Sequence, residues 1–327
     1  MIPLLHNGVT RDHLREAANS LDPNHVGPDG PRSRLLLEWL AGEVFGVSAD
    51  NIVLTSSGTA AIELALRVSR AERATLPAYG FRATMDAARA ALGDNVEFVD
   101  VWHPALKDSG ECGRRDAARV FVSLLGEVEP VILERMSKSH SGPIILDAAC
   151  SVGSHGLGEV CRNGVVDAAC VSFAASKIIS AGGGGAVAFS SLRNAKRATE
   201  ILRWDMCNAR MSELNASLAV VMTEKFDQRI ANCMSWARRV SEKLIFDAAH
   251  SESCAHHVVA LSDERNHLAR KLECAGIETS GFPKYRALAS DFPVAERWAS
   301  RAIYLPHGPG LSISDQDKIL EVLCSPL

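Results

Sequence analysis

Short apolar runs, each long enough for a β-strand, alternate with helical segments through most of this chain. The strand-like runs are residues 51–55, 73–77, 96–101, 120–124, 143–146, 168–173 and 186–189. Helical patterns lie between several of them, as at 83–92 and 130–137. This alternation predicts an α/β fold in which a mostly parallel sheet is covered by helices on both faces. Ligands of such sheets bind beyond the carboxyl ends of the strands, so polar residues that follow the strands should meet at one rim.

The last part of the chain has a different pattern. A helix predicted from about 213 to 245 is followed by a strand at 257–261, a helix at 263–275 and a closing helix near 314–323. Because 327 residues exceed one average domain, we expect two domains. The predicted large domain is 1–240, with helices at 11–20 and 31–45, and the predicted small domain is 241–327.

Composition and charge narrow the classes of function. A net charge of −4 gives no electrostatic reason to expect a nucleic-acid or anionic-membrane partner. Residues 1–15 lack the pattern of a signal peptide, and no apolar segment approaches the ~20 residues of a transmembrane helix. The nine cysteines are dispersed, which fits a reducing compartment better than a disulfide framework. We therefore expect a cytoplasmic protein with small-molecule partners.

The cysteine and histidine spacings predict no metal site. No two cysteines have the CxxC spacing that is typical of zinc sites. His256 and His257 adjoin an apolar run, and adjacent side chains of a strand point to opposite faces. Both histidines are therefore predicted to be structural.

A lysine and four consecutive glycines lie between the apolar runs 168–173 and 186–189. Apolar surroundings strip hydration from a lysine such as Lys177 and favour the neutral amine, which forms Schiff bases with aldehydes. Ser172 can donate a hydrogen bond to a phosphate, and the glycines at 182–185 let the backbone approach a ligand closely. This pattern suits a lysine that holds an aldehyde cofactor with a phosphate tail. Alternatively, Lys177 is a solvated surface residue and the glycines form a flexible connector.

Two further strand ends carry polar residues. Ser57-Gly58-Thr59 follows the run 51–55 and opens a helix, whose free N–H groups and positive dipole end suit a phosphate. The same residues would serve equally well as an ordinary N-cap. Asp147 directly follows the run 143–146, where its carboxylate could form a turn, cap a helix or face a ligand.

Five motifs now stand in a recognisable order. They are Ser57-Gly58-Thr59-Ala60-Ala61, Pro77-Ala78-Tyr79-Gly80-Phe81-Arg82-Ala83-Thr84, Asp147-Ala148-Ala149, Ser172-Phe173-x-x-x-Lys177 with its glycines, and Asn208-x-Arg210-Met211-Ser212-Glu213. Their order resembles the DegT/DnrJ/EryC1/StrS family of pyridoxal-phosphate aminotransferases, which have fold type I and act mostly on sugars. Leu305-Pro306-His307 is similar to the closing motif of that family. The resemblance covers nearly the whole chain and implies a large domain with a mostly parallel seven-stranded sheet and a smaller, shortened C-terminal domain.

The resemblance implies two catalytic residues. Lys177 matches the lysine that forms the Schiff base with pyridoxal 5'-phosphate, and Asp147 matches the aspartate that pairs with the pyridinium nitrogen. A negative charge at that position keeps the ring protonated, so that it accepts electrons from a substrate carbanion. Once released from the cofactor, the lysine is also the expected base that moves the α-proton.

The other matched residues are expected to bind the cofactor. Gly58, Thr59 and Ser172 match the phosphate-holding positions, and Phe81 matches the aromatic residue that stacks on the ring. Asn208 matches a residue that reaches the phosphate of the neighbouring subunit. The resemblance therefore implies a homodimer with shared active sites.

The implied reaction moves an amino group from an amino-acid donor, glutamate by family analogy, to a keto-sugar or related ketone or aldehyde in secondary metabolism. Two departures bear on the acceptor: Cys150 stands where the family usually has Gln or His, and Gly183 replaces a glutamate. Two alternatives stay open. One is a pyridoxal-phosphate enzyme of another reaction type, such as elimination, aldol cleavage or decarboxylation. The other is an inactive, cofactor-binding regulatory protein.

Overall fold

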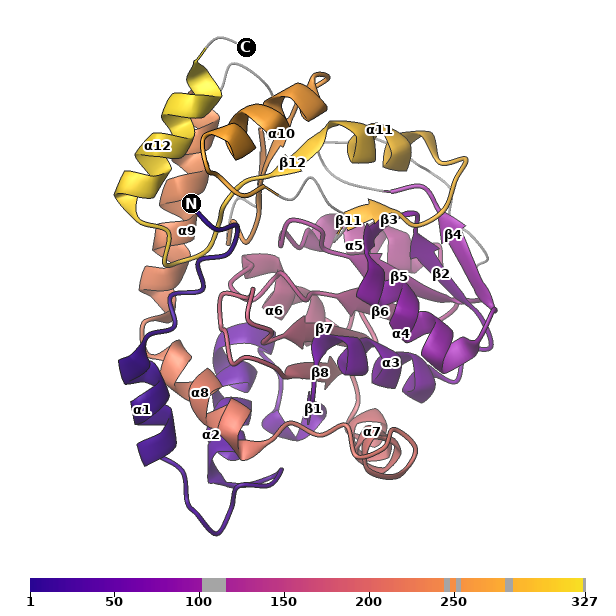
Figure 1. Cartoon of the computed structure of the whole chain (residues 1–327). Coiled ribbons are helices and arrows are strands. Elements are labelled where there is room, and N and C mark those ends of the chain that lie inside the picture. Colours follow the sequence, from indigo (N-terminus) through magenta and orange to yellow (C-terminus); the bar gives the residue numbers. More distant parts are fainter. Residues whose placement is uncertain (102–115, 244–247, 251–253, 280–284, 326–327) are drawn as a thin grey trace.

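A seven-stranded β-sheet lies at the centre of the larger part of the molecule (Figure 1). The computed structural model describes residues 1–101, 116–243, 248–250, 254–279 and 285–325. The strands are β1 (Ile52–Thr55), β2 (Ala74–Pro77), β4 (Val96–Val99), β5 (Ala118–Val122), β6 (Ile144–Asp147), β7 (Ala168–Ser172) and β8 (Gly185–Phe189). Their order is β1-β8-β7-β6-β5-β2-β4, and only β8 runs antiparallel to its neighbours. The predicted mostly parallel seven-stranded sheet is therefore confirmed.

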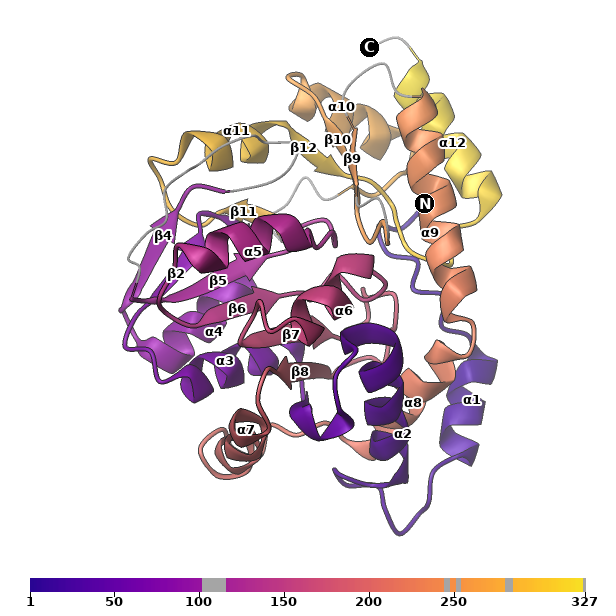
Figure 2. The same cartoon turned by 180° about the vertical axis from the view of Figure 1, so that it is seen from behind.

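Helices cover both faces of this sheet, as the two opposite views show (Figures 1 and 2). The helices that contribute to the hydrophobic cluster on one face are α3 (Gly58–Ser69), α4 (Arg82–Leu92) and α7 (Leu192–Trp204). Those that contribute to the cluster on the other face are α1 (Arg11–Asn19), α2 (Pro31–Trp39), α5 (Pro130–Lys138), α6 (His155–Arg162) and α8 (Glu213–Thr223). Every position of β6, β7 and β8 is buried, because strands covered on both faces have no solvated side.

The helix predicted from 213 to about 245 is in fact two helices, α8 and α9 (Phe226–Lys243). They pack against different partners. α8 packs against α1 and α2, and buried Glu213 accepts hydrogen bonds from the N–H groups of Arg32 (2.8 Å) and Ser33 (2.7 Å), at the start of α2. α9 instead packs its buried residues into the core of the C-terminal part of the chain. The chain changes direction where its packing partner changes, which no local pattern at this point predicts.

The C-terminal part forms a smaller layer above the carboxyl end of the sheet (Figure 1). Its three-stranded sheet has the order β12-β10-β9, from β9 (Ala248–His250), β10 (Val258–Leu261) and β12 (Ala302–Tyr304). Its helices are α10 (Arg265–Cys274), α11 (Pro293–Arg301) and α12 (Ile313–Cys324). The N-terminal segment also joins this layer, because Ile2 pairs with Ile277 and Leu5 with His307.

A strand pairing and a hydrophobic cluster are among the contacts that hold the small layer over the large sheet. β3 (Tyr79–Phe81) pairs with β11 (Tyr285–Ala287) in a two-stranded sheet. A hydrophobic cluster also spans both parts, and Tyr79 from below meets Trp298 from above, with ring centroids 6.3 Å apart. The two parts therefore enclose the rim where the strands of the large sheet end. Among the described residues, no helix combines the length and apolar character needed to cross a membrane.

Candidate active site

Six of the seven residues proposed from the sequence line one cavity of about 1030 Å³ at the carboxyl end of the sheet. They are Gly58, Thr59, Phe81, Asp147, Ser172 and Lys177. β6 ends at Asp147 and β7 ends at Ser172, and Gly58 follows β1 at the first turn of α3. The expectation that polar residues after the strands meet at one rim is therefore confirmed for this group.

The first turn of α3 forms one wall of the cavity. Gly58 and Thr59 open the helix, and the first N–H groups of any helix lack acceptors within that helix. Ser57 caps α3, since its Oγ accepts a hydrogen bond from Ala60 N (3.1 Å). The interpretation of the motif as an ordinary N-cap is therefore confirmed for Ser57, while Ser57, Gly58 and Thr59 all line the cavity. The positive end of the helix dipole there suits a phosphate.

Gly58 and Ser172 lie so close together that no larger residue fits between them. A Cβ atom built on Gly58 would stand 2.7 Å from the Ser172 Cβ. Ser172 is buried at the end of β7, and its side chain lines the same cavity. The helix terminus and the serine hydroxyl thus form one cradle of donors, as a phosphate group requires.

The glycine run after Lys177 forms a hydrogen-bonded turn that brings β8 up to α3. Gly182 and Gly184 have positive φ angles of 73° and 111°. Gly184 N donates to Ser56 O (2.9 Å), which ties the turn to the start of α3. A Cβ atom on Gly185 would stand 2.7 Å from Gly58 N and Ser57 O. The close approach expected of these glycines is therefore an approach to the helix terminus.

Asp147 is buried, and its carboxylate has two donors. Thr84 Oγ1 donates to Oδ2 (2.6 Å), and Ala149 N donates to Oδ1 (3.1 Å). Burial raises the pKa of Asp147, and the bonds from Thr84 and Ala149 and the charge of Lys177 only partly oppose that rise. A cationic partner in the cavity would favour the ionised carboxylate. A protonated ring nitrogen meets this requirement.

Lys177 is half-buried in the loop between β7 and β8 and lines the cavity. Its Nζ atom donates a hydrogen bond to Cys150 Sγ (3.1 Å). The backbone around it is fixed by short turns, since Lys177 N donates to Ala174 O (2.9 Å). The alternative of a solvated surface lysine is not what the structure shows. An amine on the wall of a cavity, held by backbone turns, is suited to a covalent bond with an aldehyde.

Phe81 is 41% exposed at the end of β3 and lines the cavity, so its position suits stacking on a ring that is bound there. Asn208 is exposed and does not line this cavity. Its φ angle is 58°, and Arg210 Nε donates to its Oδ1 (2.6 Å). The same arginine pairs with Asp29. Within one chain, therefore, Asn208 stays outside the group of the six other residues.

Several cavity residues were not proposed as site residues from the sequence. Cys150, His257, Tyr304 and His307 all line the cavity. His307 was recognisable only as part of a closing motif, and no local pattern distinguishes His257. The prediction that His256 and His257 point to opposite faces of a strand is not met. Their ring centroids lie 4.3 Å apart, just before β10 begins.

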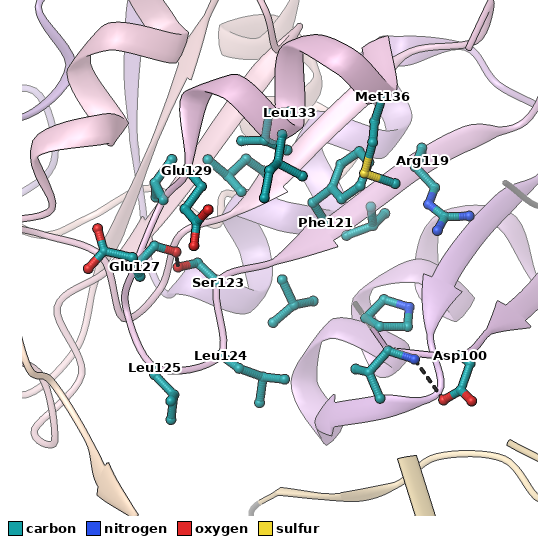
Figure 3. A pocket seen from close by; sticks show the side chains of 17 residues that line it. Asp100, Arg119, Phe121, Ser123, Leu124, Leu125, Glu127, Glu129, Leu133 and Met136 are labelled. Carbon is teal, nitrogen blue, oxygen red and sulfur yellow. Dashed lines mark hydrogen bonds between the residues drawn. The ribbon is translucent and has the colours of Figure 1, made fainter. Parts of the chain in front are cut away.

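A second cavity, of about 750 Å³, lies beneath α5 and holds none of the proposed site residues (Figure 3). Phe121 on β5 and Leu133 and Met136 on α5 gather at one end of it (Figure 3). At the other end, Asp100 accepts hydrogen bonds from the N–H groups of Val101 (2.8 Å) and, at the start of α11, Val294 (2.9 Å). Asp100 therefore serves as a helix cap, and this cavity contains none of the residues that the sequence proposed for the site.

A half-buried lysine, a buried carboxylate and a helix terminus around one cavity are the arrangement expected of a fold type I pyridoxal-phosphate enzyme, and the comparisons support that class. The chain belongs to the DegT/DnrJ/EryC1/StrS aminotransferase family, whose model matches residues 12–324. It is therefore an aminotransferase of a pyridoxal-phosphate-dependent family.

Among curated proteins, the chain is 29% identical over 310 residues to the erythromycin biosynthesis sensory transduction protein EryC1 of Saccharopolyspora erythraea. That match covers 83% of this chain and 84% of the relative. Among solved structures, the aminotransferase TlmJ of Streptoalloteichus hindustanus superposes with a TM-score of 0.84 at 20% identity, over 99% of this chain and 98% of that one. DesI in the presence of its TDP-sugar product gives 0.80 at 23% identity, over 99% and 93%. At these identities the solved structures support the fold.

Proposed function

We propose that this protein transfers an amino group from glutamate to a keto-sugar or a related ketone in secondary metabolism. The observation that carries the proposal is that Lys177 and Asp147 face the same cavity as the donor cradle of Gly58 and Ser172. The sugar class is supported by the family and by DesI, which was solved with a TDP-sugar product. The relative EryC1 carries a biosynthetic name, which supports a role in the synthesis of a secondary metabolite.

The residues around the cavity have distinct parts in this proposal. The first turn of α3 and Ser172 would hold the phosphate, Asp147 would pair with the ring nitrogen, and Lys177 would hold the aldehyde carbon. When bound, pyridoxal phosphate supplies an aldehyde that accepts the amino group and a ring that accepts the electron pair left by a departing proton. Nζ of Lys177 would take up that proton and later give it back, which completes the transfer.

The residues that the C-terminal layer contributes to the cavity would meet the acceptor. Tyr304 and His307 are two of them. His307 Nδ1 lies 2.9 Å from Leu305 O, so the ring is held by the backbone. A phenol and an imidazole that can form hydrogen bonds suit a hydroxyl-rich acceptor, because hydroxyl groups need hydrogen bonds when they leave water.

The first test is covalent trapping at Lys177. Protein saturated with pyridoxal phosphate is reduced with borohydride, digested and analysed by mass spectrometry. We expect the added mass on the peptide that contains Lys177, and no labelling in a Lys177→Ala variant. Lys138→Ala, which changes a lysine at the end of α5, is the matched control and should leave the labelling unchanged. Labelling of another lysine would overturn the site assignment.

The second test measures the reaction. Incubation with glutamate alone should release one oxoglutarate per active site and leave pyridoxamine phosphate on the protein. A different reaction type would consume a donor without oxoglutarate, and an inactive binding protein would bind the cofactor without any turnover. Either result would remove the aminotransferase proposal for glutamate, and a panel of other amino-acid donors would then separate a wrong donor from a wrong reaction.

We further propose that each active site is completed by a second copy of the chain. Asn208 lies outside the cavity of its own chain, although its motif matches a phosphate-contacting position of the family. Its side chain is exposed, and a hydrogen bond from Arg210 holds that side chain at the surface. A two-fold axis would let the same surface serve both copies.

A further inference from the structure

Three buried side chains with ligand atoms for metals gather beside the cavity. They are Cys150, His256 and His257, and their ligand atoms all lie within 4.8 Å of one another. Cys150 is 6% exposed, His256 3% and His257 5%. Cys150 Sγ lies 3.7 Å from His257 Nε2. Cys150 and His257 also line the cavity, so the cluster borders the proposed active site.

The backbone brings these three residues together from two distant parts of the chain. Cys150 follows β6, whereas the two histidines directly precede β10. Ala255 has a positive φ of 42°, and this turn stands immediately before His256. The histidines therefore do not alternate as they would on a regular strand. Cys254 Sγ donates to Gly126 O (3.4 Å), which ties the turn to the loop after β5.

The chemistry of the cluster fits zinc and similar divalent ions. A thiolate and two imidazoles are the usual zinc donors, and sites with three protein ligands keep a fourth position open. With Zn–S of about 2.3 Å and Zn–N of about 2.0–2.1 Å, tetrahedral geometry separates the sulfur and a nitrogen by about 3.6 Å. The 3.7 Å between Cys150 Sγ and His257 Nε2 is close to that separation.

The surroundings of the two histidines also favour metal binding. His256 and His257 are both buried, and burial disfavours the charged form of an imidazole. Neutral imidazole is the form that binds metals. Within the described part of the chain, Nε2 of His256 is buried without a hydrogen-bond partner. A buried polar atom without a partner is costly, and a metal ion would satisfy it.

We propose that Cys150, His256 and His257 bind one zinc-like divalent ion, with its fourth coordination position open to the cavity. A water molecule or an oxygen of the substrate would fill that position, because Cys150 and His257 both line the cavity. Binding converts the Cys150 thiol to a thiolate and releases one proton. Lys177 shares the Cys150 sulfur at 3.1 Å, so the ion would replace that hydrogen bond.

This inference goes beyond the aminotransferase proposal and does not depend on it. Metal affinity is measured directly, whereas amino transfer is measured as oxoglutarate release. A protein that binds the ion without transferring an amino group would support the metal site and remove the proposed function. A protein that transfers the amino group without binding the ion would support the proposed function and remove the metal site.

The experiment titrates Zn²⁺ into protein saturated with pyridoxal phosphate, with calorimetry and metal analysis after gel filtration as readouts. We expect one Zn²⁺ per chain. Cys150→Ser and His256→Ala should each weaken Zn²⁺ binding by more than about 100-fold, since loss of a mere orienting partner already costs about 10–100-fold. Cys161→Ser, at a buried cysteine on α6, and His140→Ala are the matched controls and should leave the affinity unchanged.

Co²⁺ provides a structural readout that does not depend on affinity. We expect the intense visible bands of four-coordinate cobalt and a sulfur-to-cobalt charge-transfer band in the difference spectrum against the Zn²⁺ form. The charge-transfer band should vanish in Cys150→Ser, while circular dichroism confirms that this variant is folded. Absence of stoichiometric binding, binding that survives both substitutions, or a six-coordinate cobalt spectrum would each overturn the proposal.

Discussion

At the scale of single residues, the site holds a carboxylate in surroundings that disfavour its charge. Asp147 is 4% exposed and receives hydrogen bonds only from Thr84 and Ala149 among the contacts the structure gives it. The raised pKa of Asp147 expresses the cost of burying that charge. A protein retains such a cost where function requires it, because most sites are free to relax to a more stable residue.

The first residue-scale prediction concerns the activity of Asp147→Asn. The amide has nearly the same shape as the carboxylate but no charge, so the ring nitrogen would lose its anionic partner. We expect the half-reaction with glutamate to slow by at least about 10²-fold. Loss of the anionic partner makes proton abstraction harder, and assisted proton transfer typically speeds a reaction by about 10²–10⁴-fold. Single-turnover measurement of oxoglutarate release tests this. Asp205→Asn, at an exposed residue after α7, is the control, and an unchanged rate in Asp147→Asn would make Asp147 a turn residue.

The second prediction concerns stability and pH in the cofactor-free protein. The folded pKa of Asp147 is raised, so protonation favours the folded state. This stabilisation is fully present below the ordinary pKa of about 4 and is lost as the pH rises through the folded pKa. The Asp147→Asn variant has no such loss. The free energy of unfolding of the variant, relative to that of the native sequence, should therefore increase as the pH rises from acid to neutral.

Urea unfolding of both cofactor-free proteins, at a series of pH values from about 4 to 8, measures this difference. The gain should level off once the pH exceeds the folded pKa of Asp147. Saturation with pyridoxal phosphate should stabilise the native sequence more than the variant, because only the native carboxylate would pair with the ring nitrogen. A difference that does not change with pH would show that burial of Asp147 has no such consequence.

At the scale of elements, the site depends on how closely β8 approaches the start of α3. Gly185 begins β8 and pairs with Ser172 on one side and Thr55 on the other. The space above Gly185 is filled by backbone atoms of Ser57 and Gly58. Backbone atoms cannot move aside as the end of a flexible side chain can. The donor cradle therefore exists only because this position has no side chain.

Gly185→Ala should accordingly damage both stability and cofactor binding. Its methyl group would stand 2.7 Å from Gly58 N, so α3 must shift away from β8. We expect a loss of about 1–3 kcal/mol in the free energy of unfolding, which is typical of overpacking, and a weaker affinity for pyridoxal phosphate. Gly183→Ala is the matched control, since its nearest neighbour would lie at 3.7 Å. Equal behaviour of the two variants would contradict the close-approach argument.

At the scale of the whole molecule, the proposed shared site makes a prediction about mixed subunits. Asn208→Ala and Lys177→Ala chains should each lack activity as pure proteins. After subunit exchange, a mixed dimer would hold one site with both lesions and one site with neither. We therefore expect about a quarter of the native activity in an equal mixture, because half of the dimers are mixed and each has one intact site.

Exchange itself is verified with two different affinity tags on the two variants. A mixture of Lys177→Ala and Asp147→Asn chains is the control, since both residues belong to the same site in one chain and mixing restores nothing. Full cofactor affinity in Asn208→Ala, or no recovered activity despite proven exchange, would show that the sites are not shared.

The sequence by itself determined the central sheet and most of the site. Local patterns carried that information, because each strand is a short apolar run. Asp147 and Ser172 stand at the ends of two such strands, and Lys177 follows the second one closely. The carboxyl ends of parallel strands meet at one edge, so residues placed there by local pattern are brought together by the topology alone. Six of the seven proposed residues meet for this reason.

Only the tertiary structure decided what the C-terminal layer adds to the site. Cys150 and His257 are 107 positions apart, and no periodicity connects them. The turn at Ala255 gives His256 and His257 a common direction that a strand pattern denies them. The break between α8 and α9 likewise follows from a change of packing partner. Contacts between distant segments depend on the packing of whole layers, and a single sequence holds no local record of them.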